Sequence, residues 1–197
     1  ASDGKLYGGT TVGGTNNAGV IFSFDPITNV QVKLFDFSSA DGYRPYNNLM
    51  QASDGKLYGT TSTGGLLNGG VIFSFDPSIA LYTRLHDFQG GTSGGLIQAV
   101  DGKLYGLQQV GGAYSKGTIF SYDPISDSLI VVMDFNGING FQPFGNLLQA
   151  SDGKLYGLTV QGGLYGRGVA FSFEIFTNTY TDLFDFHTAS GYMPFGD

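Results

Sequence analysis

Carboxylates at recurring positions are the first residues in this sequence that could do chemistry. Repeated aspartates can bind calcium or act as general acids and bases. One set precedes phenylalanine in an Asp-Phe pair, and the other follows "FSF" or "FSY". The first set is Asp36, Asp87, Asp134 and Asp185, and the second is Asp25, Asp76, Asp123 and Glu174. Because a catalytic site needs one arrangement and these occur in four equivalent copies, we expect a structural role, in which an aspartate before a turn bonds its own backbone.

The two histidines form no recognisable metal or catalytic pair. His86 aligns with Phe35, Met133 and Phe184 and so occupies an apolar position, whereas His187 falls in a loop. The chain has no Cys, and it shows no G-x-S-x-G, P-loop, dinucleotide or D-x-D-x-D-G calcium motif. We therefore expect no catalytic residue, no metal site and no cofactor, in a protein that is not an enzyme.

Aromatic and basic residues in the variable loops are better candidates for ligand binding. Variable loops on a fixed scaffold commonly carry recognition, and tyrosine can stack on sugars or protein surfaces. The loops at 12–18, 63–69, 110–116 and 161–167 share one face with those at 38–46, 89–93, 136–144 and 187–195 if the strands alternate in direction. The candidates on this loop face are Tyr43, Arg44, Tyr114, Lys116, Phe141, Tyr165, Arg167 and Tyr192. Three aromatics that follow proline, Tyr46, Phe144 and Phe195, are expected to fill the space between blades.

These positions recur because the chain is a tandem repeat. The octapeptide "ASDGKLYG" stands at 1–8, 52–59 and 150–157, and "AVDGKLYG" stands at 99–106. Aligned on it, the repeats are 1–51, 52–98, 99–149 and 150–197, which we interpret as a single repeat domain over 1–197. Each repeat continues with a "GVIFSFDP"-like segment and an Asp-Phe segment, and the first three end in "NLMQ", "GLIQ" or "NLLQ".

Within each segment the apolar period is two, which predicts β-strands. In "VIFSFD", Val20, Phe22 and Phe24 share one face of a strand. The Asp-Gly of "ASDG" predicts a tight hairpin turn, because glycine adopts the positive φ that such a turn requires. Each blade then holds four antiparallel strands, "NLLQ", "KLYGTT", "GVIFSFD" and "YTRLHDF" or their counterparts.

Four short strands in about fifty residues, repeated, predict an all-β fold of β-propeller blades. A β-helix has shorter coils, and a sandwich gives no reason for so faithful a repeat. In a propeller both faces of a blade are covered, which accounts for the apolar Ile21 and Ile72 on the second face. The glycines that end "KLYG", Gly8, Gly59, Gly106 and Gly157, are expected where the strands crowd near the axis.

The pattern "DGKLYGTTSTGG", "GGVIFSFDP" and "LHDF" resembles the GloVer tandem-repeat family of bacterial secreted and surface proteins. The resemblance covers essentially the whole chain. It implies export to the extracellular space or the bacterial cell surface, a propeller-like fold, and no established catalytic residues to transfer. The second repeat departs from the pattern, with "GGTSGG" where other repeats have glycine, two residues and proline, and the fourth has "FEIF" in place of "FDP".

One strand of the expected sixteen is missing at the termini. The first repeat begins at "DGKLYG" without a preceding "NLLQ" strand, and the fourth ends at "PFGD" where that strand would begin. Three alternatives follow: a four-bladed ring with one three-stranded blade, an eight-bladed ring of two chains, or a longer array in which a neighbour supplies the pairing. An unpaired strand edge is a template for such addition, so we expect self-association into a homo-oligomer or fibre.

Composition excludes several classes of partner. The net charge of −7 opposes binding to nucleic acid and to anionic membranes. The chain contains no run of eighteen apolar residues, so no membrane span is predicted.

The leading hypothesis is a non-enzymatic extracellular β-propeller module with a structural, adhesion or fibre-forming role. The alternative is a lectin-like module that binds glycan or a surface protein through the loop face, and a polysaccharide-active enzyme is the third hypothesis.

Overall fold

The computed structural model describes residues 1–92 and 94–195, which form strands and turns. Ser93, in the predicted loop 89–93, and residues 196–197, at the end of the predicted fourth repeat, lie outside the described residues. Across the described residues no helix is long or apolar enough to cross a membrane. The all-β prediction is confirmed for this part of the chain.

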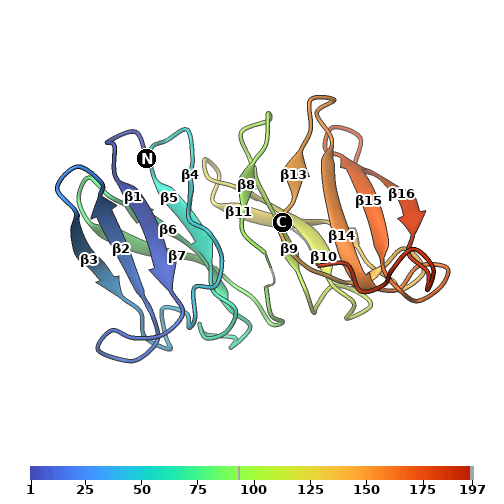
Figure 1. Ribbon diagram of the computed structural model, residues 1–197, viewed down its shortest axis with the longest axis horizontal. Helices are drawn as coiled ribbons and strands as arrows, with labels where there is room; N and C mark the ends of the chain where they lie inside the picture. Colours follow the sequence, from blue (N-terminus) through green and yellow to red (C-terminus); the bar gives the residue numbers. More distant parts are fainter. Residues whose placement is uncertain (93, 196–197) are drawn as a thin grey trace. The chain divides into compact units, whose positions relative to one another are not determined.

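The strands form four antiparallel sheets, which Figure 1 colours along the chain. The first sheet contains β1 (Leu6–Thr10), β2 (Val20–Asp25) and β3 (Val30–Asp36); the second contains β4 (Met50–Gln51), β5 (Leu57–Thr60), β6 (Val71–Asp76) and β7 (Leu81–Asp87). The third contains β8 (Ile97–Gln98), β9 (Leu104–Gln108), β10 (Thr118–Asp123) and β11 (Ser128–Asp134); the fourth contains β12 (Phe141–Pro143), β13 (Leu148–Gln149), β14 (Leu155–Gln161), β15 (Val169–Glu174) and β16 (Thr179–Asp185). In each sheet the long strands pair in chain order, as they do in a propeller blade.

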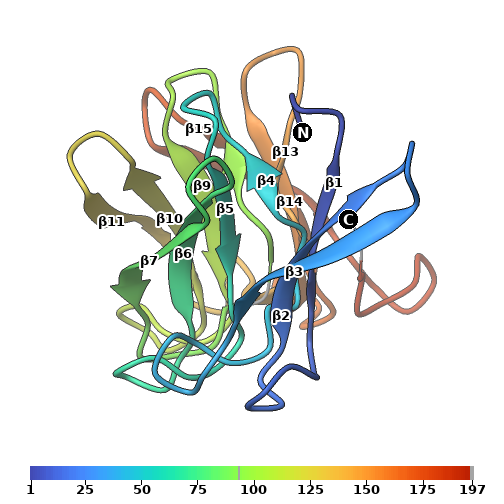
Figure 2. The ribbon, with the colours of Figure 1, turned by 90° about the vertical axis from the view of Figure 1, so that its left-hand side faces the viewer.

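The sheets are offset from the sequence repeats by one short strand. The last residues of one repeat pair with the first long strand of the next, so that Met50 lies opposite Tyr58 and Gln51 opposite Leu57. The same register joins β8 to β9 and β13 to β14. Among the described residues the first sheet has three strands, β1, β2 and β3, which Figure 2 shows. The predicted missing strand is therefore confirmed for the described residues.

The fourth sheet has five strands where the sequence pattern predicts four. The additional strand is β12, which pairs with the far end of β14, with Phe141 opposite Gln161 and Pro143 opposite Thr159. This pairing forms because β14 extends to Gln161, past the residues that β13 can reach. In the second sheet the same contact is a single bridge between Tyr43 and Thr63.

The glycine that ends each "KLYG" motif is required by the phenylalanine of the next strand. A Cβ at Gly106 would lie 2.5 Å from the Phe120 ring, and one at Gly157 would lie 2.5 Å from the Phe171 ring. Such distances are too short for real carbon atoms, so a larger residue would force the ring or the strand to move. The prediction that these glycines sit where the strands crowd is confirmed at the level of each sheet.

One aromatic cluster lies between the first and second sheets, and another lies between the third and fourth sheets. Between the first and second sheets the buried Phe37 ring packs against Phe73 and Tyr82, at centroid separations of 5.3 and 5.6 Å. The Tyr82 hydroxyl donates a hydrogen bond to the Asp41 carbonyl, so the ring is fixed at both ends. Offset and edge-to-face pairs of this kind add to the free energy of ring burial.

The third and fourth sheets repeat this arrangement. Phe135 packs against Phe171 and Tyr180, and the Tyr180 hydroxyl donates to the Asn139 carbonyl at 2.7 Å. The first and third repeats have Gln31 and Leu129 at the positions aligned with these tyrosines. The anchoring tyrosine thus occurs in alternate repeats, and each copy joins two consecutive sheets.

The chain divides into two compact units in line with this alternation. The first unit is Ala1–Thr92 and holds the first and second sheets, and the second unit is Ser93–Asp197 and holds the third and fourth. Each unit has its own aromatic cluster. The single domain over 1–197 and the closure of all four sheets into one ring stay predictions.

Candidate functional site

The aspartates of the Asp-Phe pairs hold the loops that follow the first long strand of each repeat. Each accepts a backbone N–H from the residue twenty-one positions earlier: Asp36 from Thr15 at 3.0 Å, Asp87 from Leu66 at 2.5 Å, Asp134 from Ala113 at 2.8 Å, and Asp185 from Leu164 at 2.5 Å. A glycine precedes each donor, and a Cβ at Gly112 would lie 2.2 Å from the Asp134 Oδ1. The expected structural role of these carboxylates is confirmed.

The second set of carboxylates stabilises the turn after "FSFD". Asp25 accepts the N–H of Ile27 at 2.8 Å, and Asp123 accepts that of Ile125 at 2.8 Å. These N–H donors lower the pKa of both aspartates, since they stabilise the charged form. Each carboxylate therefore bonds the backbone two residues ahead, as expected of an aspartate before a turn.

The repeated "DGKLY" motif is a turn with a tyrosine clamp. Asp101 Oδ1 accepts the Lys103 N–H at 3.1 Å, and its Oδ2 accepts the Tyr105 hydroxyl at 2.9 Å. The same two contacts occur at Asp3, Asp54 and Asp152. Burial, and then the bond to Asp3, raise the pKa of Tyr7 to about 12. The spacing of Asp, Lys and Tyr is thus fixed by one hydrogen-bonded turn.

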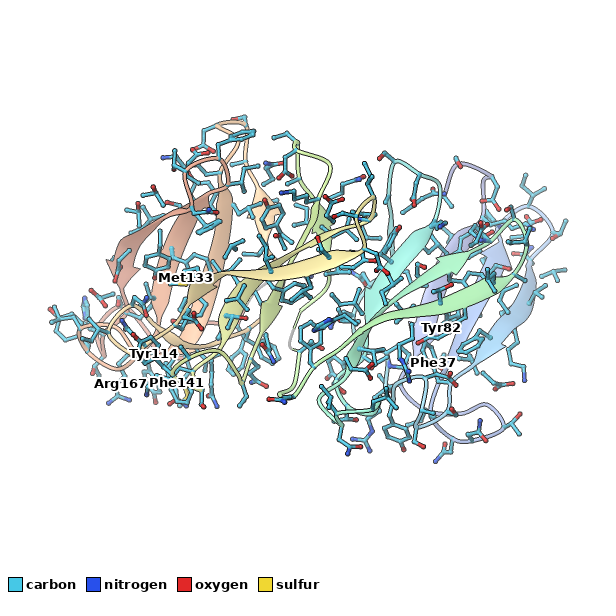
Figure 3. All side chains as sticks on the ribbon, turned by 180° about the vertical axis from the view of Figure 1, so that it is seen from behind. Phe37, Tyr82, Tyr114, Met133, Phe141 and Arg167 are labelled. Atoms are coloured by element: carbon cyan, nitrogen blue, oxygen red, sulfur yellow. The ribbon has the colours of Figure 1, made fainter. Side chains whose placement is uncertain are left out.

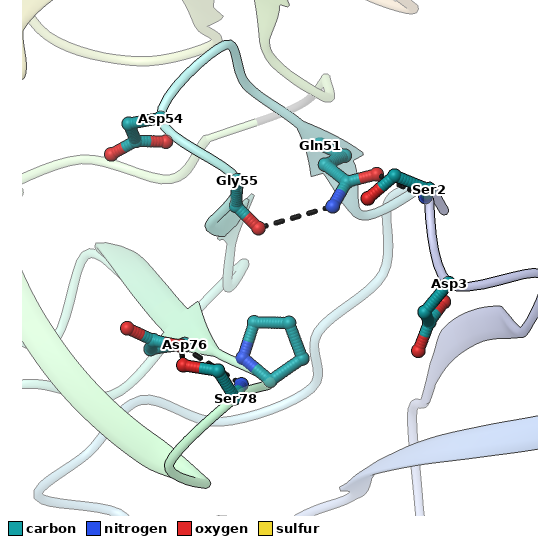
Figure 4. A pocket seen from close by; sticks show the side chains of 8 residues that line it. Ser2, Asp3, Gln51, Asp54, Gly55, Asp76 and Ser78 are labelled. Atoms are coloured by element: carbon teal, nitrogen blue, oxygen red, sulfur yellow. Dashed lines mark hydrogen bonds between the residues drawn. The ribbon is translucent and has the colours of Figure 1, made fainter.

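These turns line a hollow of about 310 Å³ in the first unit, shown in Figure 4. Its walls include three carboxylates, Asp3, Asp54 and Asp76. All three already accept hydrogen bonds from their own turns, and Asp76 accepts both the N–H and the hydroxyl of Ser78. The three carboxylates of the hollow are therefore engaged by their own turns. No group of three or more metal-ligating side chains occurs anywhere in residues 1–92 and 94–195.

Each histidine lies close in sequence to an aspartate of an Asp-Phe pair, His86 next to Asp87 and His187 two residues after Asp185. His86 is half-buried and its ring packs edge-on to Phe88 at 5.0 Å, and burial lowers its pKa. His187 packs against the ring of Tyr165 at 5.5 Å. Each histidine thus contacts an aromatic side chain, consistent with the apolar position predicted for His86.

The candidate ligand-binding residues form three cation–aromatic pairs. The Lys116 ammonium lies 4.7 Å from the Phe141 ring centre, and the Arg167 guanidinium lies 4.8 Å from that of Tyr192. In the first unit Arg44 stacks on the adjacent Tyr43 at 5.2 Å. Such pairs stabilise by roughly 0.5–1 kcal/mol at exposed sites, and they hold the cations against flat rings on the loop face.

Backbone pairing connects two of these pairs in the second unit. Phe141 pairs with Gln161, and the next residue, Gly162, bridges to Arg167. The Gln161 amide also donates to the Gln142 side chain at 3.1 Å. Lys116, Phe141, Gln161, Arg167 and Tyr192 thus lie along one continuous set of contacts. Figure 3 shows Phe141 and Arg167, with Tyr114, at the same end of the strands of this unit.

The remaining candidates differ in exposure. Tyr114 and Tyr165 are 58% and 56% exposed at loop tips, so both rings are open to solvent. Tyr43 is half-buried beside the exposed Arg44, and this pair belongs to the first unit alone. The structure therefore brings together the candidates of the third and fourth repeats and keeps the pair of the first repeat in a separate unit.

Gln142 and Met193 on this face were not among the predicted residues. Gln142 and Met193 follow the aromatic residue of each pair, at the position of Arg44, and all three have a left-handed φ of 53–59°. Each N–H group donates to a carbonyl that lies just before the second long strand of the same repeat. The Gln142 N–H, for example, donates to the Lys116 carbonyl at 3.0 Å. The signal was available, because these residues align between glycine-aromatic and proline in three repeats.

The proline-following aromatics do not fill space as expected. Tyr46 is 70% exposed and Phe195 is 65% exposed, although Phe195 contacts the Phe144 ring at 5.3 Å. Only Phe144 is half-buried. Within the described units, therefore, the expectation that Tyr46 and Phe195 are buried between blades is wrong.

The sheets define an all-β repeat protein with β-propeller-like blades. The chain belongs to the Gloeobacter/Verrucomicrobia repeat family, whose model matches residues 1–99 and again residues 89–197. Each match spans two of the fifty-residue repeats, and the resemblance found in the sequence is confirmed. No curated protein shows significant sequence similarity to the chain.

Solved structures with a similar fold include TolB from Acinetobacter baumannii, with a TM-score of 0.59 at 18% identity over 92% of this chain and 41% of TolB. The extracellular domain of BT4673, a putative one component system of B. thetaiotaomicron, has a TM-score of 0.63 at 11% identity over 94% of this chain and 22% of that one. A puromycin-hydrolyzing peptidase of Mycobacterium tuberculosis has a TM-score of 0.60 at 9% identity over 92% and 27%. The chain spans well under two thirds of each, and the likeness shows the fold alone.

Proposed function

We propose that this chain is a non-enzymatic, extracellular repeat module of β-propeller blades with a structural, adhesion or fibre-forming role at the bacterial surface. One observation carries the proposal: the carboxylates that recur in all four repeats bond the backbone of their own turns and loops. Residues that could do chemistry are thereby committed to holding the scaffold. Membership of the repeat family and the fold likeness to an extracellular domain support the location.

The assembly state of the protein in solution tests the structural role. The mass is measured by light scattering after size exclusion, and the same fraction is imaged by electron microscopy. A doubled mass with an eight-bladed ring, or filaments, supports an assembling module. A compact monomer near 20.9 kDa that adheres to no bacterial surface or matrix polymer contradicts the role.

A search for enzymatic activity provides the opposing test. Depolymerisation of a polysaccharide that is lost in Asp134→Asn, yet retained in Asp36→Asn, would contradict the non-enzymatic assignment. The two aspartates make equivalent loop contacts, so a purely structural role predicts similar behaviour of both variants.

The second candidate function is a lectin-like module that binds glycan, or a surface protein, through the loop face of the second unit. The observation that favours it is the linked pair of cation–aromatic contacts at Phe141 and Tyr192, beside the exposed Tyr114 and Tyr165. Exposed tyrosine rings stack on sugar faces, and neighbouring amides and cations hydrogen-bond hydroxyl and carboxylate groups.

A glycan array with two matched variants tests this candidate. Arg167→Ala removes a cation at the loop end of β14, whereas Lys154→Ala removes one next to the opposite end of the same strand. Binding that is weakened about ten-fold in Arg167→Ala and unchanged in Lys154→Ala supports the loop face. Absence of any retained glycan, or equal losses in both variants, contradicts it.

A further inference from the structure

The first long strand of each sheet has an inner edge, the edge that faces away from the second long strand. This edge is paired with a short strand in β5, β9 and β14 and is open in β1. In the complete sheets a two-residue strand lies antiparallel to the start of the first long strand, as Met50 and Gln51 lie opposite Tyr58 and Leu57. Among the described residues, β1 pairs with β2 and with no other strand. Backbone groups along an unpaired edge can hydrogen-bond an added strand.

The open edge leaves an apolar side chain uncovered. Leu6 is 58% exposed, whereas its counterparts Leu57, Leu104 and Leu155 are 2%, 0% and 0% exposed. Tyr7 is half-buried, as is Tyr156 in the complete fourth sheet, so the exposure of Leu6 alone distinguishes the open edge. An added strand would cover part of Leu6, whose counterpart Leu57 is buried in a cluster that also contains Ile21 and Phe37 of the preceding sheet.

A vacant position for a leucine side chain lies beside this edge. In the complete sheets Leu49, Leu96 and Leu147 pack over the "KLYG" glycine, each with its Cδ2 atom 2.8–3.0 Å from where a Cβ on that glycine would be. At Gly8 the three nearest atoms all belong to Phe22, and the third is 3.7 Å away. A separate hollow of about 240 Å³ lies beside Leu6 and Tyr7, and its other walls are Ala1, Leu49, Gln51 and Leu57.

A glutamine defines the end of each existing short strand. The side-chain amides of Gln51, Gln98 and Gln149 donate to the turn carbonyls of Gly55, Gly102 and Gly153 at 3.1, 2.9 and 2.8 Å. Gly4 occupies the equivalent place in the first turn, with the same φ of about 80°. The first turn thus already has the backbone conformation that receives such an amide.

We propose that the inner edge of β1 binds an extended Leu-Φ-Gln segment, where Φ is leucine, isoleucine or methionine, supplied by another chain built of these repeats. The Φ residue would pair with Tyr7, the glutamine with Leu6 and Gly4, and the leucine would pack over Gly8 beside the Phe22 ring. All three such segments of this chain, in β4, β8 and β13, are already paired in their own sheets. The donor is therefore a segment from outside the described residues, added by β-augmentation.

This inference deepens the proposed assembly role and rests on it, because the donor is another repeat protein. The proposed contact is specific at two positions. A leucine is required over Gly8, and a glutamine is required at the first turn. A strand without leucine would lose the burial of a whole side chain, which is a loss of at least ten-fold in affinity.

Peptide titration followed by NMR on the ¹⁵N-labelled protein tests the inference. The ligand is the hexapeptide Phe-Gly-Asn-Leu-Leu-Gln, a copy of residues 144–149, and the control peptide carries the Leu147→Asn change. Saturable shifts of the Leu6, Tyr7 and Gly8 amides with a dissociation constant on the order of 1 mM, and at least ten-fold weaker binding of the control, are expected. No shifts, or equal shifts with both peptides, would overturn the inference.

Two protein variants locate the binding site. Gly8→Ala places a methyl group in the leucine position, and Leu6→Gln removes the apolar side chain that the added strand would cover; each should weaken peptide binding in a protein that stays folded. Binding that persists in both variants overturns the site. The outcome is separable from the assembly test: peptide binding by a protein that neither assembles nor adheres contradicts the structural role alone, and filaments without peptide binding contradict the strand site alone.

Discussion

At the scale of single residues, the recurring aspartates act on the backbone of this chain. The "DGKLY" turn shows this most clearly, because one carboxylate accepts both a backbone N–H and a tyrosine hydroxyl in all four repeats. The hydroxyls differ in burial, since Tyr105 is buried and Tyr156 is partly exposed. The same contact should therefore have a different energetic value in different repeats.

Asp101→Ala should destabilise the protein more than Asp152→Ala. The first variant leaves the buried Tyr105 hydroxyl without its acceptor, which costs roughly 1–3 kcal/mol, whereas water can replace the acceptor at Tyr156. The free energy of unfolding is measured by urea denaturation of both variants. Equal losses would show that tyrosine burial does not determine the value of the contact.

The turn aspartates also predict how stability depends on pH. The Ile125 N–H lowers the pKa of Asp123 below its ordinary value of 3.8. A carboxylate whose pKa is lower in the folded state stabilises the fold above pH 3.8, and this contribution is lost as the pH falls through the folded value.

We therefore expect the urea midpoint to fall between about pH 6 and about pH 3, and to fall less in Asp123→Asn than in the unmodified protein. Ile125→Val, a change at a side chain 98% exposed, serves as the control and should keep the full decrease. A decrease in Asp123→Asn as large as in the control would assign the acid sensitivity to other groups.

At the scale of elements, the contact between "KLYG" glycine and the next strand sets the spacing within each sheet. On its other side the "VIFSFD" strand or its counterpart pairs with the following strand in one shared register, with a bulge after its first two residues, in all four sheets. The glycines differ in what covers them, since Leu96 lies over Gly106 and no leucine lies within 3.7 Å of a Cβ placed at Gly8.

Gly106→Ala should lower the free energy of unfolding by roughly 1–3 kcal/mol through overpacking, and Gly8→Ala should lower it less. The added methyl at Gly106 is confined by the Phe120 ring at 2.5 Å and the Leu96 side chain at 2.9 Å, whereas at Gly8 the Phe22 ring alone must move. Thermal unfolding of both variants measures the difference. A larger loss in Gly8→Ala would contradict the open edge of β1.

At the scale of the whole molecule, the alternation of tyrosine with glutamine or leucine divides four similar repeats into two units. Tyr82 packs on Phe35, Phe37 and Phe73, all in the first unit. The equivalent contacts of Tyr180 are confined to the second unit. A repeat protein of this kind gains its stability from neighbour contacts, and each tyrosine supplies such contacts within its own unit.

Tyr82→Ala should reduce hydrogen-exchange protection in residues 1–92 and leave protection in residues 94–195 largely unchanged. The variant removes a ring that contacts the first unit alone, so local unfolding becomes easier there. Hydrogen exchange with mass spectrometry gives the protection along the chain. Equal loss over both ranges would mean that the chain unfolds as one domain, as the sequence interpretation over 1–197 supposes.

The sequence by itself determined the strands, their order and the turns that join them. These features depend on short-range patterns, such as period-two alternation and the Asp-Gly-Lys-Leu-Tyr spacing. The same patterns occur in all four repeats. The same repetition revealed the strand missing before β1. It also placed the cationic and aromatic residues of the loops on one face, because strand direction alternates along a meander.

Tertiary structure alone decided which of those residues meet. Lys116 reaches Phe141, and Tyr82 reaches the Asp41 carbonyl, across loops whose course depends on packing between sheets. Pairing of Phe141 with Gln161 adds a fifth strand that no local pattern marks. The exposure of Tyr46 and Leu6 likewise depends on which neighbour covers them, and burial is a property of the packed molecule that a residue's own sequence context does not contain.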